Sequence, residues 1–97
     1  CASNFPVSLV GPSGSYGTGS LSMSGTMQNV KFSIADDKKA CSGTAPNFEP
    51  LTISIPVTCT DGQTGTVILT RDSMILSGHG TLTLSGGEQT PILYNAR

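Results

Sequence analysis

The chain has 97 residues, which fits a single small domain. Charged residues make up only 11% of it and the formal net charge is −1, so it lacks the basic surface that nucleic-acid binding requires. Gly, Ser and Thr fill over a third of the positions, which disfavours a helical bundle, and no apolar run approaches the roughly 18 residues of a membrane-spanning helix.

The first third of the chain predicts three strands. Apolar residues alternate with other residues over 5–10, and Pro6 favours the start of a strand or a sheet edge. The segment 11–15 is rich in Gly, Pro and Ser and is typical of a turn. A second strand is expected over 16–24, where glycines occupy one face of its first half, and a third over 30–34.

The middle of the chain contains one turn and one clear strand. The segment 36–39 (Asp-Asp-Lys-Lys) is the only charge cluster in the sequence, and we interpret it as a solvated hairpin turn. Two prolines and little pattern mark 42–50. The cleanest alternation covers 51–59 and places Cys59 on the core face. Pro56 within this run predicts a sheet edge or a bulge.

Four further short strands are expected around 67–69, 74–76, 81–84 and 92–94, separated by turns. No stretch of more than five or six residues has convincing helical spacing. The sequence therefore predicts an all-β domain of about seven or eight short antiparallel strands, either a small barrel or a sandwich.

Two segments are similar to each other. Residues 17–25 and 78–86 both begin with Gly-x-Gly and end in Ser-Gly. Between these, each has two apolar residues two positions apart, which would lie on the same face of a strand. Chance similarity is one explanation in a chain so rich in Gly and Ser, and duplication is the other. In either case glycine inside a strand indicates a sharp bend or a close backbone approach, so the two strands are candidates for neighbours that help to close the sheet.

Cys1 is followed by small polar residues. This start looks like that of a mature bacterial lipoprotein, whose N-terminal cysteine carries diacylglycerol on sulfur and usually an acyl chain on its amine. We therefore expect lipidation of Cys1, for example with palmitate, and membrane anchoring through two or three chains. Residues 1–4 would then form a tether to the single domain, 5–97. The alternative is that the sequence begins at a cysteine by chance.

Cys41 and Cys59 remain once Cys1 is assigned to lipid. An exported protein reaches an oxidising compartment, where this pair would form a structural disulfide that closes an 18-residue loop. Metal binding is the competing interpretation, but two thiols at this distance and one histidine do not make a zinc spacing. A redox-active pair would more typically be Cys-x-x-Cys.

The chain resembles small uncharacterised lipoproteins of Gram-negative, particularly alphaproteobacterial, cells. The resemblance spans about 17–88 and rests on Ala-Cys-Ser-Gly at 40–43, on the Cys-x-Asp-Gly-x-x-Gly pattern at 59–65 and on the Gly-x-Gly strand at 78–84. Gln63 departs from the pattern, which more often has arginine there, so no role is assigned to that side chain. The resemblance implies an envelope location and the disulfide, and it brings no activity.

Few residues suggest chemistry. His79 is the only histidine, and neighbours such as Ser77 and Asp72 do not define a catalytic triad by their spacing. The adjacent carboxylates at 36–37 would point in different directions on a turn. The segment 61–65 could be a ligand loop, but it is simpler to interpret it as a turn in which Asp61 bonds its own backbone. We predict no catalytic, cofactor-binding or metal-binding residue.

The expected function is that of a structural or accessory lipoprotein and not of an enzyme. Ala2 lacks the aspartate that retains many lipoproteins in the inner membrane of enteric bacteria, so we expect anchoring at the periplasmic face of the outer membrane. Strand edges around Gly17 and Gly78 would dock onto another envelope protein or complex. The alternative is a lipid-anchored inhibitor or small-ligand binder, similar to β-barrel inhibitors of lysozyme, that uses the turn at 36–39 or at 61–65.

Overall fold

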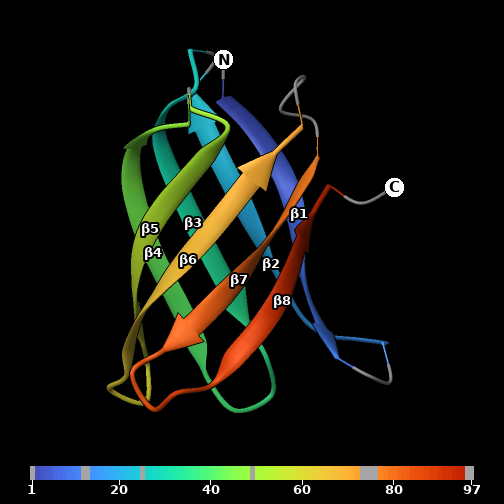
Figure 1. Cartoon of the computed structure of the whole chain (residues 1–97), viewed down its shortest axis with the longest axis vertical. Coiled ribbons are helices and arrows are strands. Elements are labelled where there is room, and N and C mark those ends of the chain that lie inside the picture. The colour runs from blue at the N-terminus through green and yellow to red at the C-terminus, as the bar shows by residue number, and fades with distance from the viewer. Residues whose placement is uncertain (1, 12–13, 25, 49, 73–76, 96–97) are drawn as a thin grey trace.

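Eight antiparallel strands form a closed barrel in the structure, a computed structural model that describes residues 2–11, 14–24, 26–48, 50–72 and 77–95 (Figure 1). Each strand pairs with the next in the chain, and β8 pairs with β1. The all-β prediction is confirmed, and the barrel is the correct alternative. No helix that could span a membrane occurs among these residues. The strands are β1 (Ala2–Gly11), β2 (Gly14–Ser24), β3 (Gln28–Ala35), β4 (Ala40–Asn47), β5 (Thr52–Cys59), β6 (Thr64–Arg71), β7 (Gly78–Leu84) and β8 (Gln89–Tyr94).

The interior of the barrel is filled by side chains because alternate residues of each strand point inward. In β5, for example, exposed and buried residues alternate without exception from Thr52 to Cys59. Among the largest fully buried side chains are Tyr94, Phe32 and Phe48. The buried apolar residues of β1–β4 are Val7, Leu9, Leu21, Met23, Val30, Phe32, Ile34, Cys41 and Ala45, and those of β5–β8 are Ile53, Ile55, Val57, Cys59, Val67, Leu69, Leu82, Leu84, Ile92 and Tyr94.

Glycines allow neighbouring strands to approach closely, as expected for the two Gly-x-Gly segments. A Cβ atom at Gly19 would overlap the carbonyl oxygen of Ser33 on β3, and one at Gly80 would overlap that of Ile68 on β6. The expectation that these strands are neighbours is wrong: β2 pairs with β1 and β3, and β7 pairs with β6 and β8. β7 is paired on both sides at Gly78, so the free edge that we expected there is missing. β2 pairs with β3 only over 18–22, so among the described residues Gly17 is paired with β1 alone.

β4 lies in a segment that shows no strand pattern in the sequence. Its inward positions hold Cys41, Gly43 and Ala45, which are too small to produce apolar alternation. A Cβ atom at Gly43 would overlap the carbonyl oxygen of Pro56 on β5, so this position needs glycine where the two strands are closest. The strand is therefore defined by its neighbours and not by its own composition.

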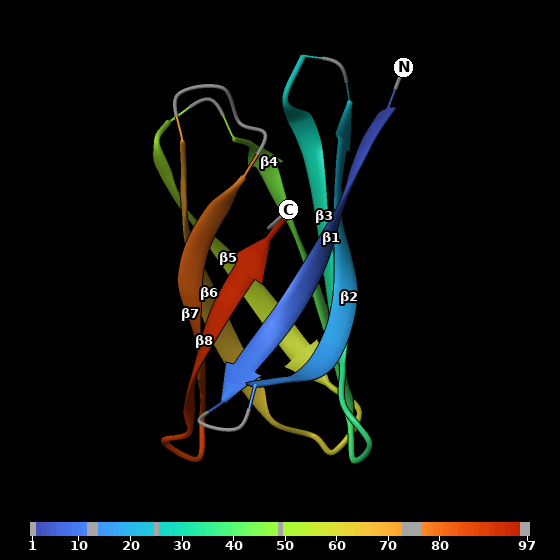
Figure 2. The ribbon, with the colours of Figure 1, turned by 90° about the vertical axis from the view of Figure 1, so that its right-hand side faces the viewer.

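Two of the eight strand contacts are short. β4 pairs with β5 only over 41–43 and 57–59, and β1 pairs with β8 only over 7–9 and 92–94. Elsewhere neighbouring strands pair over at least five residues. We call these contacts the β4/β5 seam and the β1/β8 seam. They divide the barrel into two four-stranded meanders, β1–β4 and β5–β8 (Figure 2).

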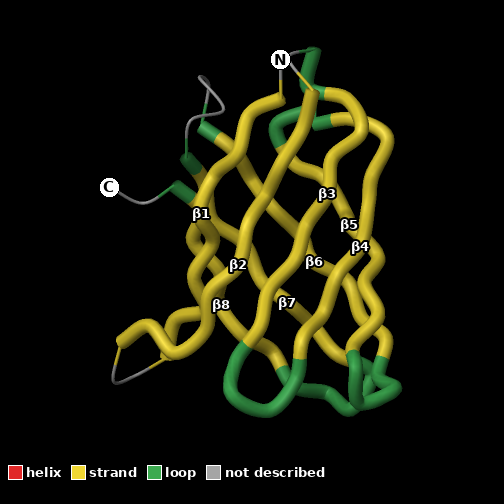
Figure 3. Tube along the Cα trace, turned by 180° about the vertical axis from the view of Figure 1, so that it is seen from behind, coloured by secondary structure: helices red, strands yellow, loops and turns green. Residues whose placement is uncertain are grey.

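The two ends of the barrel differ in character. The β3–β4, β5–β6 and β7–β8 turns lie together at one end, which we call the turn end (Figure 3). β1 begins and β8 ends at the opposite end. Residues 2–4, expected to form a tether, belong to β1 and pair with 22–24 of β2.

Candidate functional site

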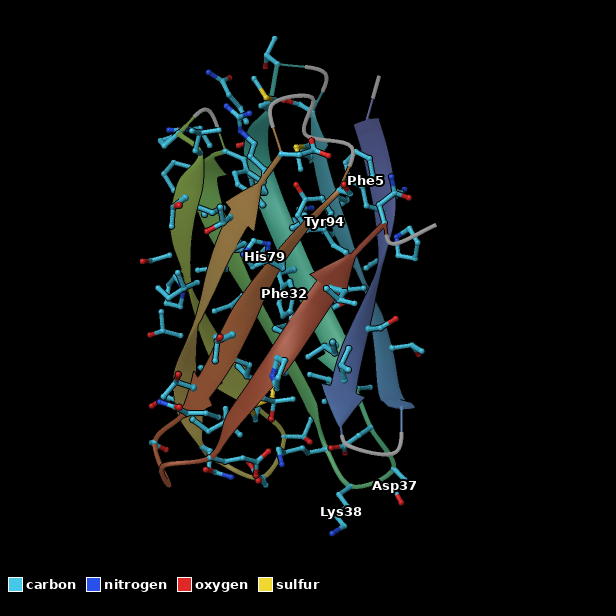
Figure 4. All side chains as sticks on the ribbon, turned by 45° about the vertical axis from the view of Figure 1, so that its right-hand side comes forward. Phe5, Phe32, Asp37, Lys38, His79 and Tyr94 are labelled. Atoms are coloured by element: carbon cyan, nitrogen blue, oxygen red, sulfur yellow. A yellow bond between two sulfur atoms is a disulfide. The ribbon has the colours of Figure 1, made fainter. Side chains whose placement is uncertain are left out.

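Asp36 orders the β3–β4 turn at the turn end. Its Oδ1 accepts hydrogen bonds from the backbone N–H groups of Lys38, at 2.7 Å, and Lys39, at 2.9 Å. These two bonds stabilise the carboxylate and hold the pKa of Asp36 below its usual value. Asp37 and Lys38 project from the turn away from the barrel (Figure 4). The predicted hairpin turn is confirmed.

Asp61 orders the β5–β6 turn in the same way. Its carboxylate accepts hydrogen bonds from the side-chain amide of Gln63, at 2.8 Å, and from the backbone N–H of Gln63, at 3.1 Å. The side-chain bond and then the backbone bond lower the pKa of Asp61. Gly62 has a φ of 91°, a conformation that favours glycine. The expected turn, with Asp61 bonded to its own backbone, is confirmed.

Hydrogen bonds and one ion pair connect the three turns. The Gly86 N–H donates to Gln63 Oε1 at 3.2 Å, which joins the β7–β8 turn to the β5–β6 turn. Lys39 Nζ lies 3.8 Å from Glu88 Oε1, and the Thr60 N–H donates to the Ala40 carbonyl at 2.9 Å. Gln63 therefore has a structural role that its position in a sequence pattern did not reveal. The turn end is a preorganised polar surface.

The wall of the barrel is almost free of charge. Among the outward-facing strand residues that the structure describes, Lys31 in β3 is the charged one, because Arg71 at the last position of β6 lies on the same side of its strand as the buried Val67 and Leu69. The other positions hold mainly Ser, Thr and Pro. Charge is therefore concentrated in the turns, and the wall presents hydroxyl groups and methyl groups.

One part of this wall also exposes large apolar side chains. Ile68 is 40% exposed and Leu93 is 39% exposed. Ile68 lies opposite Thr81, which lies opposite Pro91, and His79 lies opposite Leu93. These five residues form one continuous area on β6–β8, which we call the outer patch.

His79 is an exposed member of the outer patch. Its side chain makes no hydrogen bond or ion pair with the described part of the chain. Ser77 donates instead to Asp72 Oδ2 at 2.6 Å, so these two residues pair without the histidine. Ser73, which is also near His79 in the sequence, and the strand expected around 74–76 lie outside the described residues.

Cys41 and Cys59 face each other across the β4/β5 seam and form the predicted disulfide. Their Cα atoms are 4.0 Å apart, and both side chains are buried in the barrel. Among the described residues, no group of three or more His, Cys, Asp or Glu side chains could hold a metal ion. Cys1 lies outside the described residues, so its lipidation stays a prediction.

A shallow hollow of about 490 Å³ lies on the outside of β2–β5, near the disulfide. Five of its ten lining residues carry a hydroxyl group and the other five are apolar. The hydroxyl residues are Thr18, Ser33, Ser42, Thr58 and Thr60. Charged side chains are missing from this lining, so the hollow offers hydrogen bonds but no fixed charge to a ligand.

Tyr94 is the buried polar group that the sequence did not point to. Its ring packs against Phe5 and Phe48, with ring centroids 5.8 and 6.1 Å away, and its side chain is fully buried (Figure 4). Its hydroxyl group has no hydrogen-bond partner among the described residues. Burial raises the pKa of Tyr94 to about 12, and the negative charge of Asp72 adds to the shift.

Arg71 holds the connection between β4 and β5 beside this buried ring. Its Nε donates to the carbonyl oxygens of Phe48, at 3.1 Å, and Pro50, at 3.3 Å. The backbone N–H of Arg71 also donates to the Leu51 carbonyl oxygen at 2.8 Å. No sequence pattern indicated this role, because it depends on the pairing of β5 with β6 and on the path of the β4–β5 connection, which together bring the three carbonyl groups to Arg71.

Comparison with protein-family models, with curated proteins and with solved structures found no match.

Proposed function

We propose that this protein is a non-enzymatic accessory lipoprotein, anchored at the periplasmic face of the outer membrane, that binds another protein of the cell envelope. The outer patch on β6–β8 is the observation that carries the proposal. It combines exposed Ile68 and Leu93 with Thr81, Pro91 and His79, and it contains no charged side chain. The centres of protein–protein interfaces are likewise depleted of charge and rich in packed apolar groups.

This proposal replaces docking through strand edges by docking through the barrel wall. β7 is paired on both sides and cannot add a partner strand at Gly78, and β2 is open at Gly17 only over the short stretch before its pairing with β3 begins at Thr18. A wall of short hydroxyl side chains allows a partner surface to approach closely. Ile68 and Leu93 then supply the apolar area that such a wall otherwise lacks.

The disulfide supports the proposed compartment. Cys41 and Cys59 are paired in the barrel, and such bonds persist in oxidising compartments such as the bacterial periplasm. Membrane attachment depends on the predicted lipidation of Cys1 and is tested separately by the intact mass of the protein isolated from membranes.

Charge substitution in the outer patch tests the binding part. We expect Ile68→Lys and Leu93→Lys to abolish co-purification of the partner from gently solubilised envelopes, because a lysine would have to be desolvated in the interface. Ser33→Lys on β3 is the matched control: it adds the same charge at an exposed position of the wall outside the patch. Equal partner recovery from all three variants, or a wild-type protein that is strictly monomeric and without a partner, would refute the proposal.

The turn end favours a second candidate, a lipid-anchored inhibitor. Both turns suggested for this role lie at the same end, and Gln63, Lys39 and Glu88 connect them to the β7–β8 turn. Preorganised polar loops lose little entropy when they enter a catalytic cleft. A titration against lysozyme tests this candidate, and the absence of inhibition at about micromolar protein would remove it.

A further inference from the structure

The two seams are bordered by prolines. The chain has six prolines, and four of them lie in described strands: Pro6 in β1, Pro46 in β4, Pro56 in β5 and Pro91 in β8. These four strands are the ones that form the β1/β8 and β4/β5 seams. Each proline lies beyond the paired part of its seam. Proline lacks the N–H that a further ladder bond would need.

Hydrogen bonds show that these prolines turn their backbone toward the seams. The Asn95 N–H donates to the Pro6 carbonyl, so Pro6 faces β8 and, by the alternation of a strand, Pro91 faces β1. The carbonyl of Pro56 points at Gly43 across the β4/β5 seam. The Ala40 carbonyl accepts from the backbone N–H of Thr60, the residue that follows β5, so Pro46, six residues after Ala40 on β4, also faces β5.

Neither meander can bury its apolar face alone. Each consists of four strands with one face that points into the barrel, and the buried side chains of β1–β4 pack against those of β5–β8 in one core. If the two short seams open, each meander exposes this entire face to water. It must then be covered again, either by the other meander of the same chain or by the equivalent meander of a second copy.

Two covalent connections hold the meanders together: the chain between Asn47 and Thr52, and the Cys41–Cys59 disulfide. We propose that this disulfide fixes the meanders of one chain to each other, and that its reduction by a dithiol, which is itself oxidised to a disulfide, allows two copies to exchange them. In the exchanged dimer, β1–β4 of one copy closes with β5–β8 of the other. Reoxidation by a small disulfide, which is reduced to two thiols for each bond formed, restores two protein disulfides, but each now joins Cys41 of one copy to Cys59 of the second.

This exchange has a cost in the linker. Phe48 is fully buried and Arg71 holds the carbonyl oxygens of Phe48 and Pro50, and these contacts must open while the meanders separate. Closure within one chain is independent of protein concentration, whereas exchange requires a second copy. The exchanged form is therefore expected only when the disulfide is reduced and the protein is concentrated.

Isotope mixing tests the inference. Unlabelled and ¹⁵N-labelled protein, both with Cys1→Ser to remove the third thiol, are mixed in equal amounts, reduced, incubated at about 1 mM or about 10 µM and reoxidised. Free thiols are alkylated, and trypsin with chymotrypsin cuts after Lys39, Phe48 and Arg71. Mass spectrometry then identifies the disulfide-linked peptides. A sample that is never reduced is the control.

Up to about half of the Cys41–Cys59 pairs are expected to join labelled to unlabelled peptide at high concentration, in a dimer with native circular dichroism, and very few at low concentration or in the control. Only same-isotope Cys41–Cys59 pairs after reduction would overturn the inference, whether or not the reduced protein stays folded. Mixed-isotope Cys41–Cys41 and Cys59–Cys59 pairs as frequent as mixed Cys41–Cys59 pairs would also overturn it, because they indicate random cross-linking.

Discussion

Replacement of Tyr94 by phenylalanine is expected to stabilise the barrel. The Tyr94 side chain is fully buried and its hydroxyl group makes no hydrogen bond to any described residue, so folding removes the group from water without compensation from this part of the chain. Such an unsatisfied group costs about 1–3 kcal/mol, and phenylalanine keeps the shape of the ring against Phe5 and Phe48. We therefore expect Tyr94→Phe to raise the free energy of unfolding by about 1–3 kcal/mol at neutral pH.

The same substitution changes the response to alkali. Because the pKa of Tyr94 is about 12 in the folded state and about 10 in an unfolded chain, the unfolded state releases this proton first as the pH rises. The free energy of unfolding is therefore not affected by this ionisation below pH 10. Between pH 10 and 12 it falls by about 3 kcal/mol, because the unfolded state loses the proton more readily than the folded state. Tyr94→Phe removes this loss, so the gap between the two proteins widens in alkali.

Urea denaturation at pH 7 and across pH 9–12 measures both effects. With an m value of about 1–2 kcal/mol/M, the midpoint of the variant should lie about 1 M higher at pH 7. Absorbance titration gives the ionisation directly, since Tyr16 is the only other tyrosine. A variant that is less stable than wild type would show that the hydroxyl group is bonded. Parallel loss of stability in both proteins above pH 10 would refute the assigned pKa.

Three other predictions follow from the fold. Substitution of Cys41 and Cys59 by serine should lower the free energy of unfolding by about 2–5 kcal/mol in urea, and two alkylatable thiols in the oxidised protein would contradict the bond. Gly43→Ala should destabilise by about 1–3 kcal/mol or more because its Cβ overlaps a neighbouring carbonyl, whereas Gly86→Ala, which meets only a flexible side-chain end, should have little effect on thermal unfolding. Asp36→Asn should reduce the loss of stability below about pH 4. A carboxylate with a lowered pKa stabilises the fold above that pH and loses this contribution when it is protonated, so an unchanged acid transition would refute the prediction.

The strands with large inward side chains could be predicted from the sequence. β5 reproduces the alternation seen over 51–59, and Pro56 lies beside a seam, as a proline within a strand suggests. β4 could not be predicted in this way, because its inward positions include Gly43 and Ala45, which are too small to produce a visible alternation of apolar and polar residues. The order of strands was also out of reach, since alternation gives the inward face of a strand but not its neighbours.

Site prediction succeeded where the interaction is local. The turn of Asp61 with Gln63 depends on residues two positions apart, and the sequence contains all that is needed to expect it. The outer patch, by contrast, combines Ile68 with Leu93 from strands that meet only through β7. The burial of Tyr94 likewise depends on residues distant in the chain, and alternation could place its ring inward but could not reveal its unpaired hydroxyl group.

The β1/β8 seam has a mechanical consequence. β1 begins and β8 ends at the same end of the barrel, so tension between these two strands loads the pair of Val7 and Tyr94 before the other pairs of the seam. Hydrogen bonds perpendicular to antiparallel strands then break one after another, as in a zipper, and not all at once. The barrel is expected to yield at low force along this line. The chain between Cys41 and Cys59 does not extend, because the covalent bond between these two residues carries the tension past it.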